Sequence, residues 1–223
     1  MQVHVRTIAS RVYKYPLQLR LHIPQPPSAM KLVHLLSAIL LAQTAVSTEN
    51  TIQDTDGRPL MAHTEYYVRP SSAGWGGGLI LSSRDRQCPL NVAQIESETS
   101  NGLPLTFAPS NSSENTVREM ADIRIAFRVA TVCVQSTAWR LGEVDPRTGR
   151  RYIVTGSGAN GGGGGLFKVA PYGDAYKLVA CPGVCMACNG GACEDVGVLA
   201  ENGRRWLGSS VAVAPLSFVF KRV

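Results

Sequence analysis

The sequence predicts an all-β domain, either a barrel or a sandwich, from three observations. Short runs of alternating apolar and polar residues recur along the chain, and clusters of Gly, Pro, Asn and Ser separate them. No amphipathic helix longer than two turns is found. Many short strands separated by turns are typical of a single all-β domain, and residues 48–223 suit one domain of this kind.

The clearest predicted strand lies at 123–129, where apolar Ile123, Ile125, Phe127 and Val129 alternate with Arg124, Ala126 and Arg128. Similar short runs predict strands at 65–68, 79–81, 152–155, 176–180, 211–213 and 217–221. Turn signals lie between them at Asn101-Gly102, Asn202-Gly203 and 161–165. No internal repeat is visible.

A secretory signal peptide is predicted at residues 30–47. Lys31 is followed by an apolar run from Leu32 to Ala42, and Ala45 and Ser47 place small residues before a cleavage site. A buried helix and a membrane anchor are the alternatives, but the run is shorter than the roughly 20 residues that span a bilayer. Residues 1–29 are basic and contain no acidic residue, which is also typical of a transit peptide. Because a signal peptide starts at Met30, we interpret residues 1–29 instead as an upstream extension or a disordered leader. We therefore expect residues 48–223 to be secreted, to the extracellular space or a vacuolar storage compartment, with no membrane partner after cleavage.

The net charge of +6 does not predict a nucleic-acid partner. Residues 1–47 hold five of the 22 basic residues and none of the 16 acidic ones, so the remainder is nearly neutral.

All six cysteines lie after residue 47: Cys88, Cys133, Cys181, Cys185, Cys188 and Cys193. An even number behind a signal peptide predicts disulfides. The last four could instead bind zinc, and Cys185-x-x-Cys188 could be a redox pair. Because Gly, Pro and Asn surround them and the pattern fits neither site well, we favour structural disulfides and expect no metal and no cofactor.

Other patterns that could carry chemistry are better explained as turns. Asp54 and Asp56, with Gly57 and Pro59, predict a turn rather than a calcium loop, because too few ligands follow. Gly156 to Gly161 matches a dinucleotide fingerprint, but four more glycines follow where a helix is needed. His63 is the only histidine after residue 47 and no Gly-x-Ser-x-Gly elbow occurs, so we predict a solvent-facing turn histidine and no enzyme.

The most specific stretch is IQDTDGRPL at 52–60 followed by YYV at 66–68. It resembles the N-terminal signature of the plant Kunitz-type (soybean trypsin inhibitor-like) inhibitors. The resemblance continues along the chain, and several stretches are most similar to the cereal α-amylase/subtilisin inhibitors. The further matching stretches are GGGL at 76–79, CPL at 88–90, DIRIAF at 122–127, CVQSTAW at 133–139, GRRYIVTG at 149–156, YKLVAC at 176–181, DVGV at 195–198 and WLG at 206–208.

The resemblance implies a disulfide-stapled β-trefoil of twelve short strands and pseudo-threefold symmetry over residues 48–223. It implies a Cys88–Cys133 disulfide and, as in miraculin-like members, Cys181–Cys193 and Cys185–Cys188; the sequence alone permits fifteen pairings. It also implies that a stiff loop between Phe107 and Ile123 enters a protease cleft as a substrate does. Its residues would be Pro109, Ser110, Asn111, Ser112 and Ser113, with Ser110 or Asn111 in the first specificity pocket.

Three features depart from the trypsin-directed pattern. No basic residue occurs between Gly102 and Val117, and Ala62 stands where legume inhibitors carry an asparagine that braces the loop. Asn111-Ser112-Ser113 is a glycosylation sequon, and a glycan on Asn111 would block a cleft. The expected function is a secreted, monomeric inhibitor of a hydrolase, of subtilisin-type serine proteases rather than trypsin. The alternatives are an α-amylase inhibitor using another face, although the chain departs from the cereal relatives between 161 and 176, or a non-inhibitory storage or binding protein.

Overall fold

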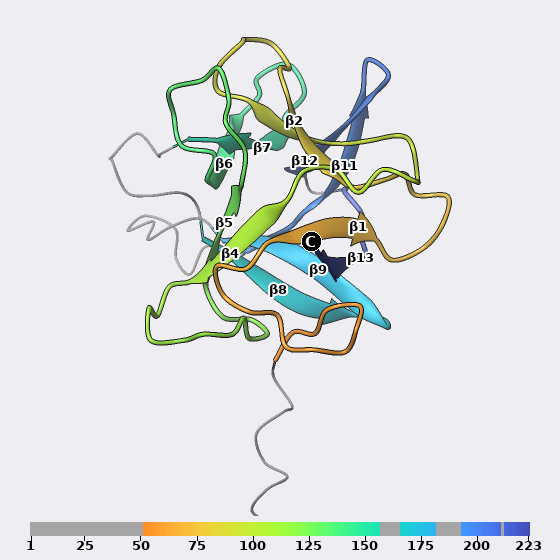
Figure 1. Ribbon diagram of the computed structural model, residues 1–223. Coiled ribbons are helices and arrows are strands. Elements are labelled where there is room, and N and C mark those ends of the chain that lie inside the picture. Colours follow the sequence, from red (N-terminus) through yellow and green to blue (C-terminus); the bar gives the residue numbers. More distant parts are fainter. Residues whose placement is uncertain (1–50, 157–165, 182–192, 211) are drawn as a thin grey trace, which may run out of the picture. The chain divides into compact units, whose positions relative to one another are not determined.

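The computed structural model describes residues 51–156, 166–181, 193–210 and 212–223, all within one compact unit, Thr48–Val223. These ranges form an all-β structure without a helix (Figure 1). None of their segments forms a helix long and apolar enough to cross a membrane. The strands are β1 Tyr66–Pro70, β2 Leu79–Ser82, β3 Asn91–Gln94, β4 Leu105–Pro109, β5 Ile123–Phe127, β6 Trp139–Val144, β7 Arg151–Thr155, β8 Leu166–Tyr172, β9 Ala175–Cys181, β10 Glu194–Asp195, β11 Gly197–Glu201, β12 Arg204–Ser209 and β13 Phe218–Arg222.

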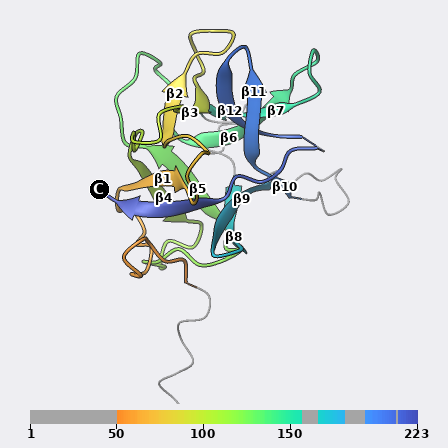
Figure 2. The same cartoon turned by 90° about the vertical axis from the view of Figure 1, so that its right-hand side faces the viewer.

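The strands form two sheets. The first has the order β10-β9-β13-β1-β4-β5-β8, and β8 also pairs with β9, so that six of its strands close into a ring. The second consists of the hairpins β2–β3, β6–β7 and β11–β12, whose inner strands β3, β7 and β12 each pair with the other two. Figures 1 and 2 place the three hairpins at one end of the ring. Two groups of loops therefore lie at opposite ends of the domain.

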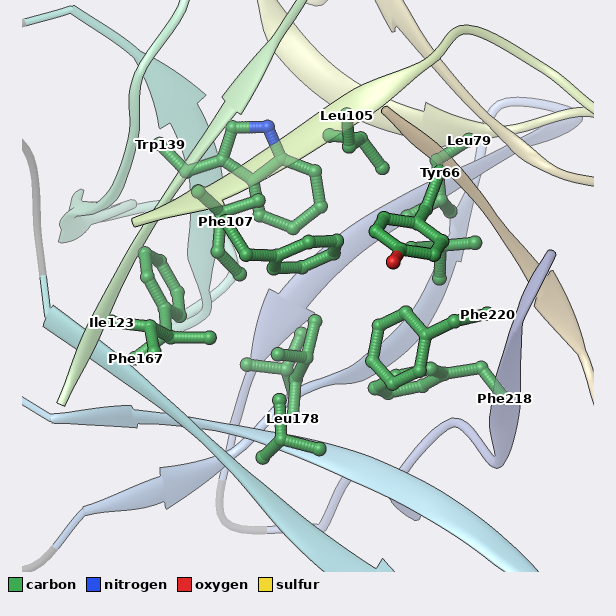
Figure 3. Close-up of a cluster of buried hydrophobic side chains, with 14 of the residues drawn as sticks. Tyr66, Leu79, Leu105, Phe107, Ile123, Trp139, Phe167, Leu178, Phe218 and Phe220 are labelled. Atoms are coloured by element: carbon green, nitrogen blue, oxygen red, sulfur yellow. The ribbon is translucent and has the colours of Figure 1, made fainter. Parts of the chain in front are cut away.

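The ring encloses an aromatic core (Figure 3). β5 shows how the sequence builds it, because Ile123, Ile125 and Phe127 are buried while Arg124 between them is exposed. Inside the ring, Phe107 and Phe220 make an edge-to-face contact with ring centroids 5.2 Å apart. This packing holds β4 against β13, and the buried Ile123 holds the start of β5, so both strands that flank the β4–β5 loop are anchored in the core.

Most predicted strands appear with bounds shifted by one or two residues, but the strand predicted at 211–213 is wrong. Its described residues lie in a turn, where the Val213 amide donates to the Ser210 carbonyl at 3.1 Å. The chain then continues to Leu216, whose amide donates to the Val196 carbonyl at 3.0 Å. The apolar residues here thus belong to a turn, from which the chain crosses to β13. The glycine run at 161–165 lies outside the described residues.

The candidate inhibitory loop

The β4–β5 loop, residues 110–122, begins at a tightly paired base. β4 and β5 pair from Leu105↔Phe127 to Pro109↔Ile123, and the Ser110 amide extends the ladder by donating to the Asp122 carbonyl at 2.8 Å. Ser110, Asn111, Ser112 and Ser113 are all exposed. Pro109, which the sequence placed in the loop, is instead the buried last residue of β4. The tip is therefore formed by the four polar residues alone.

Asn111 organises this tip with its own side chain. Its Oδ1 accepts hydrogen bonds from the Ser113 hydroxyl at 2.8 Å and the Ser113 amide at 3.2 Å. Its Nδ2 donates to Glu114 Oε1 at 3.3 Å, and the Glu114 amide donates to the Asn111 carbonyl at 3.1 Å. Asparagine commonly makes such bonds in turns. The tip is thus a hydrogen-bonded turn rather than an extended, unbonded segment.

Residues 51–62, the N-terminal segment, brace the loop behind its tip. The Ile52 amide donates to the Val117 carbonyl at 3.1 Å, and the Val117 amide donates to the Leu60 carbonyl at 2.8 Å. The side chains of Ile52, Leu60 and Val117 are completely buried. Figure 1 shows this segment, in orange, beside the green β4–β5 loop at the end opposite the hairpins. The loop is therefore anchored to the core at Val117.

The predicted turn at Asp54 shapes this segment. Asp54 Oδ1 accepts from the amides of Asp56 and Arg58, both at 3.0 Å, and Gly57 takes a positive φ of 73°. The Thr55 amide then donates to the Phe220 carbonyl of β13 at 2.8 Å. In the described ranges no group of three or more His, Cys, Asp or Glu side chains is placed to hold a metal ion. The carboxylate of Asp54 acts on the backbone of its own turn.

Ala62 and His63 lie next to the loop. The backbone amide of Ala62, which the family resemblance matches to the bracing asparagine of legume inhibitors, donates to the Asn115 carbonyl at 2.8 Å. His63 is an exposed turn residue with φ of 59°, and its amide donates to the Phe107 carbonyl at 2.9 Å. Neither contact uses a side chain. At these two positions the contact with the loop therefore comes from the main chain, a role that residue identity alone does not reveal.

The far side of the loop is tied to β8. The Met120 amide donates to the Val169 carbonyl at 2.8 Å, and Lys168 Nζ lies 2.7 Å from Asp122 Oδ1. Arg118, the first basic residue after the tip, sits behind the Val117 anchor with its side chain 59% exposed. No arginine or lysine is thus presented at the tip.

The described cysteines form two disulfides, Cys88–Cys133 and Cys181–Cys193. These are two of the three pairs that the family resemblance implies. The third, Cys185–Cys188, lies outside the described residues. Cys88–Cys133 joins the loop between β2 and β3 to the loop between β5 and β6, at the hairpin end of the domain.

A buried arginine that no sequence pattern predicted links the three hairpins. Arg84, whose side chain is 8% exposed, donates to Asp145 at 2.6 Å and to Glu201 at 2.8 Å. Its guanidinium also stacks 3.9 Å from the ring centre of Tyr152. Hydrogen bonds from the Arg147 amide and the Arg84 guanidinium lower the pKa of Asp145 to about 2. The hydrogen bonds that Arg84 donates to the carboxylates of Glu201 and Asp145 raise its own pKa.

Comparison with known proteins gives the family. The model of the family described as "Trypsin and protease inhibitor" (Kunitz_legume) matches residues 52–222. An α-amylase/subtilisin inhibitor of Oryza sativa subsp. japonica is 38% identical over 195 residues, which cover 84% of this chain and 92% of the rice protein. The endogenous α-amylase/subtilisin inhibitor of Triticum aestivum is 36% identical over 166 residues, covering 70% and 87%.

Solved structures agree. The rice bifunctional α-amylase/subtilisin inhibitor superposes with a TM-score of 0.64 at 38% identity, covering 79% of this chain and all of the rice chain. Soybean trypsin inhibitor superposes with a TM-score of 0.65 over 78% of this chain and 99% of its own; at 23% identity it shows the fold alone.

The fold and the matched sequence thus define a plant protein-inhibitor scaffold, not an enzyme. The chain belongs to the Kunitz-type (Kunitz_legume) inhibitor family.

Proposed function

We propose that this chain is a secreted inhibitor of a serine endopeptidase, of the subtilisin type rather than trypsin, that binds through the β4–β5 loop. The observation that carries the proposal is an exposed four-residue tip, Ser110 to Ser113, held between a paired base and the buried Val117 anchor. Family membership and the names of the rice and wheat relatives support hydrolase inhibition.

Stiffness is what would make this loop an inhibitor rather than a substrate. A segment that is already ordered loses little conformational entropy when it binds, so more of the contact energy appears as affinity. The Ser110 and Glu114 amides are both satisfied within the loop, and Asn111 closes the turn between them. A protease cleft would receive a turn whose shape is set before the encounter.

The tip chemistry sets the expected selectivity. Trypsin requires a basic side chain to pair with an aspartate in its specificity pocket. Here the pocket would receive Ser110 or Asn111, while Arg118 lies behind the Val117 anchor. We therefore expect weak trypsin inhibition.

The glycosylation sequon at Asn111 would control the same loop. Ser113 Oγ already contacts the Asn111 carboxamide at 2.8 Å, and both residues are exposed. A glycan on Asn111 Nδ2 would project from the tip and exclude it from a protease cleft. Only the unglycosylated form should then inhibit through this loop.

Inhibition of α-amylase through a different surface is the second candidate, favoured by the rice and wheat relatives, whose names include that activity. A storage or binding role without inhibition is the third, because one fold supports several functions.

The molecular organisation belongs to the same proposal. We infer a β-trefoil of twelve strands, in which the six-stranded ring and the three hairpins supply the twelve and the two-residue β10 is an addition. The leader would be cleaved after Ser47, leaving residues 48–223 as a monomeric, extracellular or vacuolar domain.

The test is an inhibition panel with the full chain expressed through a eukaryotic secretory pathway, before and after enzymatic removal of glycans. Subtilisin, trypsin, chymotrypsin and α-amylase are assayed, and the secreted protein is sequenced from its N-terminus. Subtilisin inhibition that falls at least tenfold on Asn111→Pro substitution, with Tm unchanged, supports the proposal. Silence toward every protease would refute it, and activity against α-amylase alone would move the function to the second candidate.

A further inference from the structure

A pocket of about 340 Å³ opens at the hairpin end of the domain, between the β2–β3 loop and the β6–β7 hairpin. Its volume lies at the lower end of the range of small-molecule sites, about 300–1,000 Å³, and suits a ligand with a single ring. Figures 1 and 2 place the hairpins at the end of the domain opposite the β4–β5 loop. The pocket is therefore separate from the surface proposed to contact a protease.

Strand pairing brings the side chains of the pocket floor onto one face of the hairpin sheet. Arg140 of β6 pairs with Val154 of β7, and Val154 in turn pairs with Asn91 of β3. Tyr152 lies two residues before Val154 and points to the same side, because side chains alternate along a strand. The chain neighbours of these residues point the other way, into the main core: Val92, Trp139 and Ile153.

Arg84 forms a wall of the pocket that is fixed by the protein itself. Hydrogen bonds to Asp145 at 2.6 Å and to Glu201 at 2.8 Å hold its guanidinium. The guanidinium stacks 3.9 Å from the ring centre of Tyr152, whose hydroxyl donates to Glu201 at 2.9 Å. The wall is thus shaped before a ligand arrives, and little ordering remains to oppose binding.

Two other polar side chains that line the pocket are left without partners by the described part of the chain. Asn91 is 8% exposed, and no hydrogen bond of its carboxamide is found among the described residues. Arg140 Nε is buried, and within the same residues it has no hydrogen-bond partner. Buried polar groups are nearly always hydrogen-bonded, so these two groups indicate contacts that a bound molecule would supply.

The charges around the pocket favour a ligand with one negative charge. Arg86 and Arg140 form no ion pair within the described ranges, and a guanidinium pairs well with a carboxylate. The lining also includes the exposed carboxylates of Asp85 and Glu143. These would repel a second negative charge, as on a phosphate, but would accept hydrogen bonds from hydroxyl groups.

The remaining lining suits a hydroxylated ring. The Asn91 carboxamide can both donate to and accept from a hydroxyl group. Val144, which is 57% exposed, and Val154 offer apolar surface to the C–H face of a ring. The pocket therefore combines a cation, hydroxyl-binding groups and an apolar surface within one small volume.

We propose that this pocket binds a small hydroxycarboxylate of the sugar-acid class, with its carboxylate on Arg140 and a hydroxyl group on Asn91. A free sugar acid and the terminal unit of an acidic oligosaccharide present the same chemistry. The proposal goes beyond inhibition, since no residue of the β4–β5 loop lines the pocket. Binding here and inhibition of a protease should therefore be independent.

The experiment is isothermal titration calorimetry on the full secreted chain at low ionic strength. The probes are D-galacturonate and D-glucuronate, with trigalacturonate to represent an oligosaccharide. D-galactose lacks the carboxylate of galacturonate, and inorganic phosphate tests for a simple anion site. Arg140→Met removes the charge, and Asn91→Leu removes the carboxamide at similar size. Arg124→Met is the matched control, because Arg124 is an exposed arginine on β5 outside the pocket. Thermal unfolding checks that each variant is folded.

We expect one of the two sugar acids to bind about tenfold or more tightly than galactose and phosphate. Arg140→Met should weaken that binding about tenfold or more, Asn91→Leu should weaken it too, and Arg124→Met should leave it unchanged. Subtilisin inhibition should be the same in Arg140→Met as in the wild type. Tighter binding of trigalacturonate than of galacturonate would identify an oligosaccharide as the source, and weaker or equal binding a free acid.

Three results would overturn the proposal. The first is a wild-type chain that binds neither sugar acid. The second is phosphate or galactose binding as tightly as the sugar acids, which would show a site that does not read the carboxylate and the hydroxyl groups together. The third is unchanged affinity in a folded Arg140→Met variant, and this result decides the matter even if Asn91→Leu does not fold.

Discussion

Replacing Val117 with alanine tests whether the β4–β5 loop owes its stiffness to the anchor behind its tip. The side chain is completely buried, and its backbone makes hydrogen bonds to both Ile52 and Leu60. Alanine keeps those backbone bonds but removes two methyl groups from the contact between the loop and the N-terminal segment. The loop then loses packing without losing its sequence at the tip.

The expected loss follows from burial. Each buried carbon group removed costs about 0.8 kcal/mol in transfer free energy, and incomplete collapse of the cavity raises the total to about 2–3 kcal/mol. Part of this loss is local, because Val117 holds the loop rather than the ring. The tip should therefore become more mobile in the native state. The inhibition constant of the protein for subtilisin should then rise about tenfold or more, because the tip must be ordered when it binds.

Val92→Ala is the matched control. Val92 is equally buried, but it lies on β3 in the hairpin sheet, outside both the β4–β5 loop and the N-terminal segment. Urea unfolding should give both variants similar losses of stability, whereas hydrogen exchange at Ser110 and Glu114 should accelerate only in Val117→Ala. Equal inhibition constants and equal exchange in the two variants would show that the loop does not depend on its anchor.

Three further outcomes are expected from the hairpin end. Arg84→Met should destabilise the fold by about 3 kcal/mol, the low end for breaking a buried ion pair, whereas Arg147→Met, 65% exposed, should change the urea midpoint little. Because the folded pKa of Asp145 is depressed to about 2 from 3.8, its stabilisation is present above pH 3.8 and lost as the pH falls through about 2. Asp145→Asn should therefore flatten the stability profile below pH 4, and a profile as steep as the wild type's would contradict this. Gly78→Ala should cost roughly 2 kcal/mol or more, because its Cβ would lie 1.8 Å from the Asn101 carbonyl oxygen; an unchanged Tm would refute that packing.

The fold could be predicted where burial follows a simple period. In β5 the buried Ile123, Ile125 and Phe127 alternate with the exposed Arg124 and the half-buried Ala126, and the sequence pattern predicted this alternation. β3 gives no such pattern, because Asn91, Val92, Ala93 and Gln94 are all buried and two of them are polar. Val92 packs in the main core and its neighbour Ala93 in a second buried cluster, so β3 is covered on both faces and burial does not alternate along it.

The position of the candidate loop could be predicted, but its bracing could not. The tip is contiguous in sequence, whereas Val117 is held by Ile52 and Leu60, more than fifty residues earlier. Arg84 likewise meets Asp145 and Glu201 at separations of 61 and 117 residues. Such contacts join residues that have no local signature, and here several of them use only backbone atoms.

Because the N-terminal segment, residues 51–62, supports the β4–β5 loop from behind, proteolysis of this segment would change the loop without touching its tip. An exopeptidase that trimmed the domain past Leu60 would remove both partners of Val117 without touching a residue of the tip. The ring strands, which begin at Tyr66, would remain. The extent of this trimming in the tissue would then set the fraction of the protein whose β4–β5 loop is still anchored. An affinity tag fused directly before Thr51 would disturb the same contact between Ile52 and Val117.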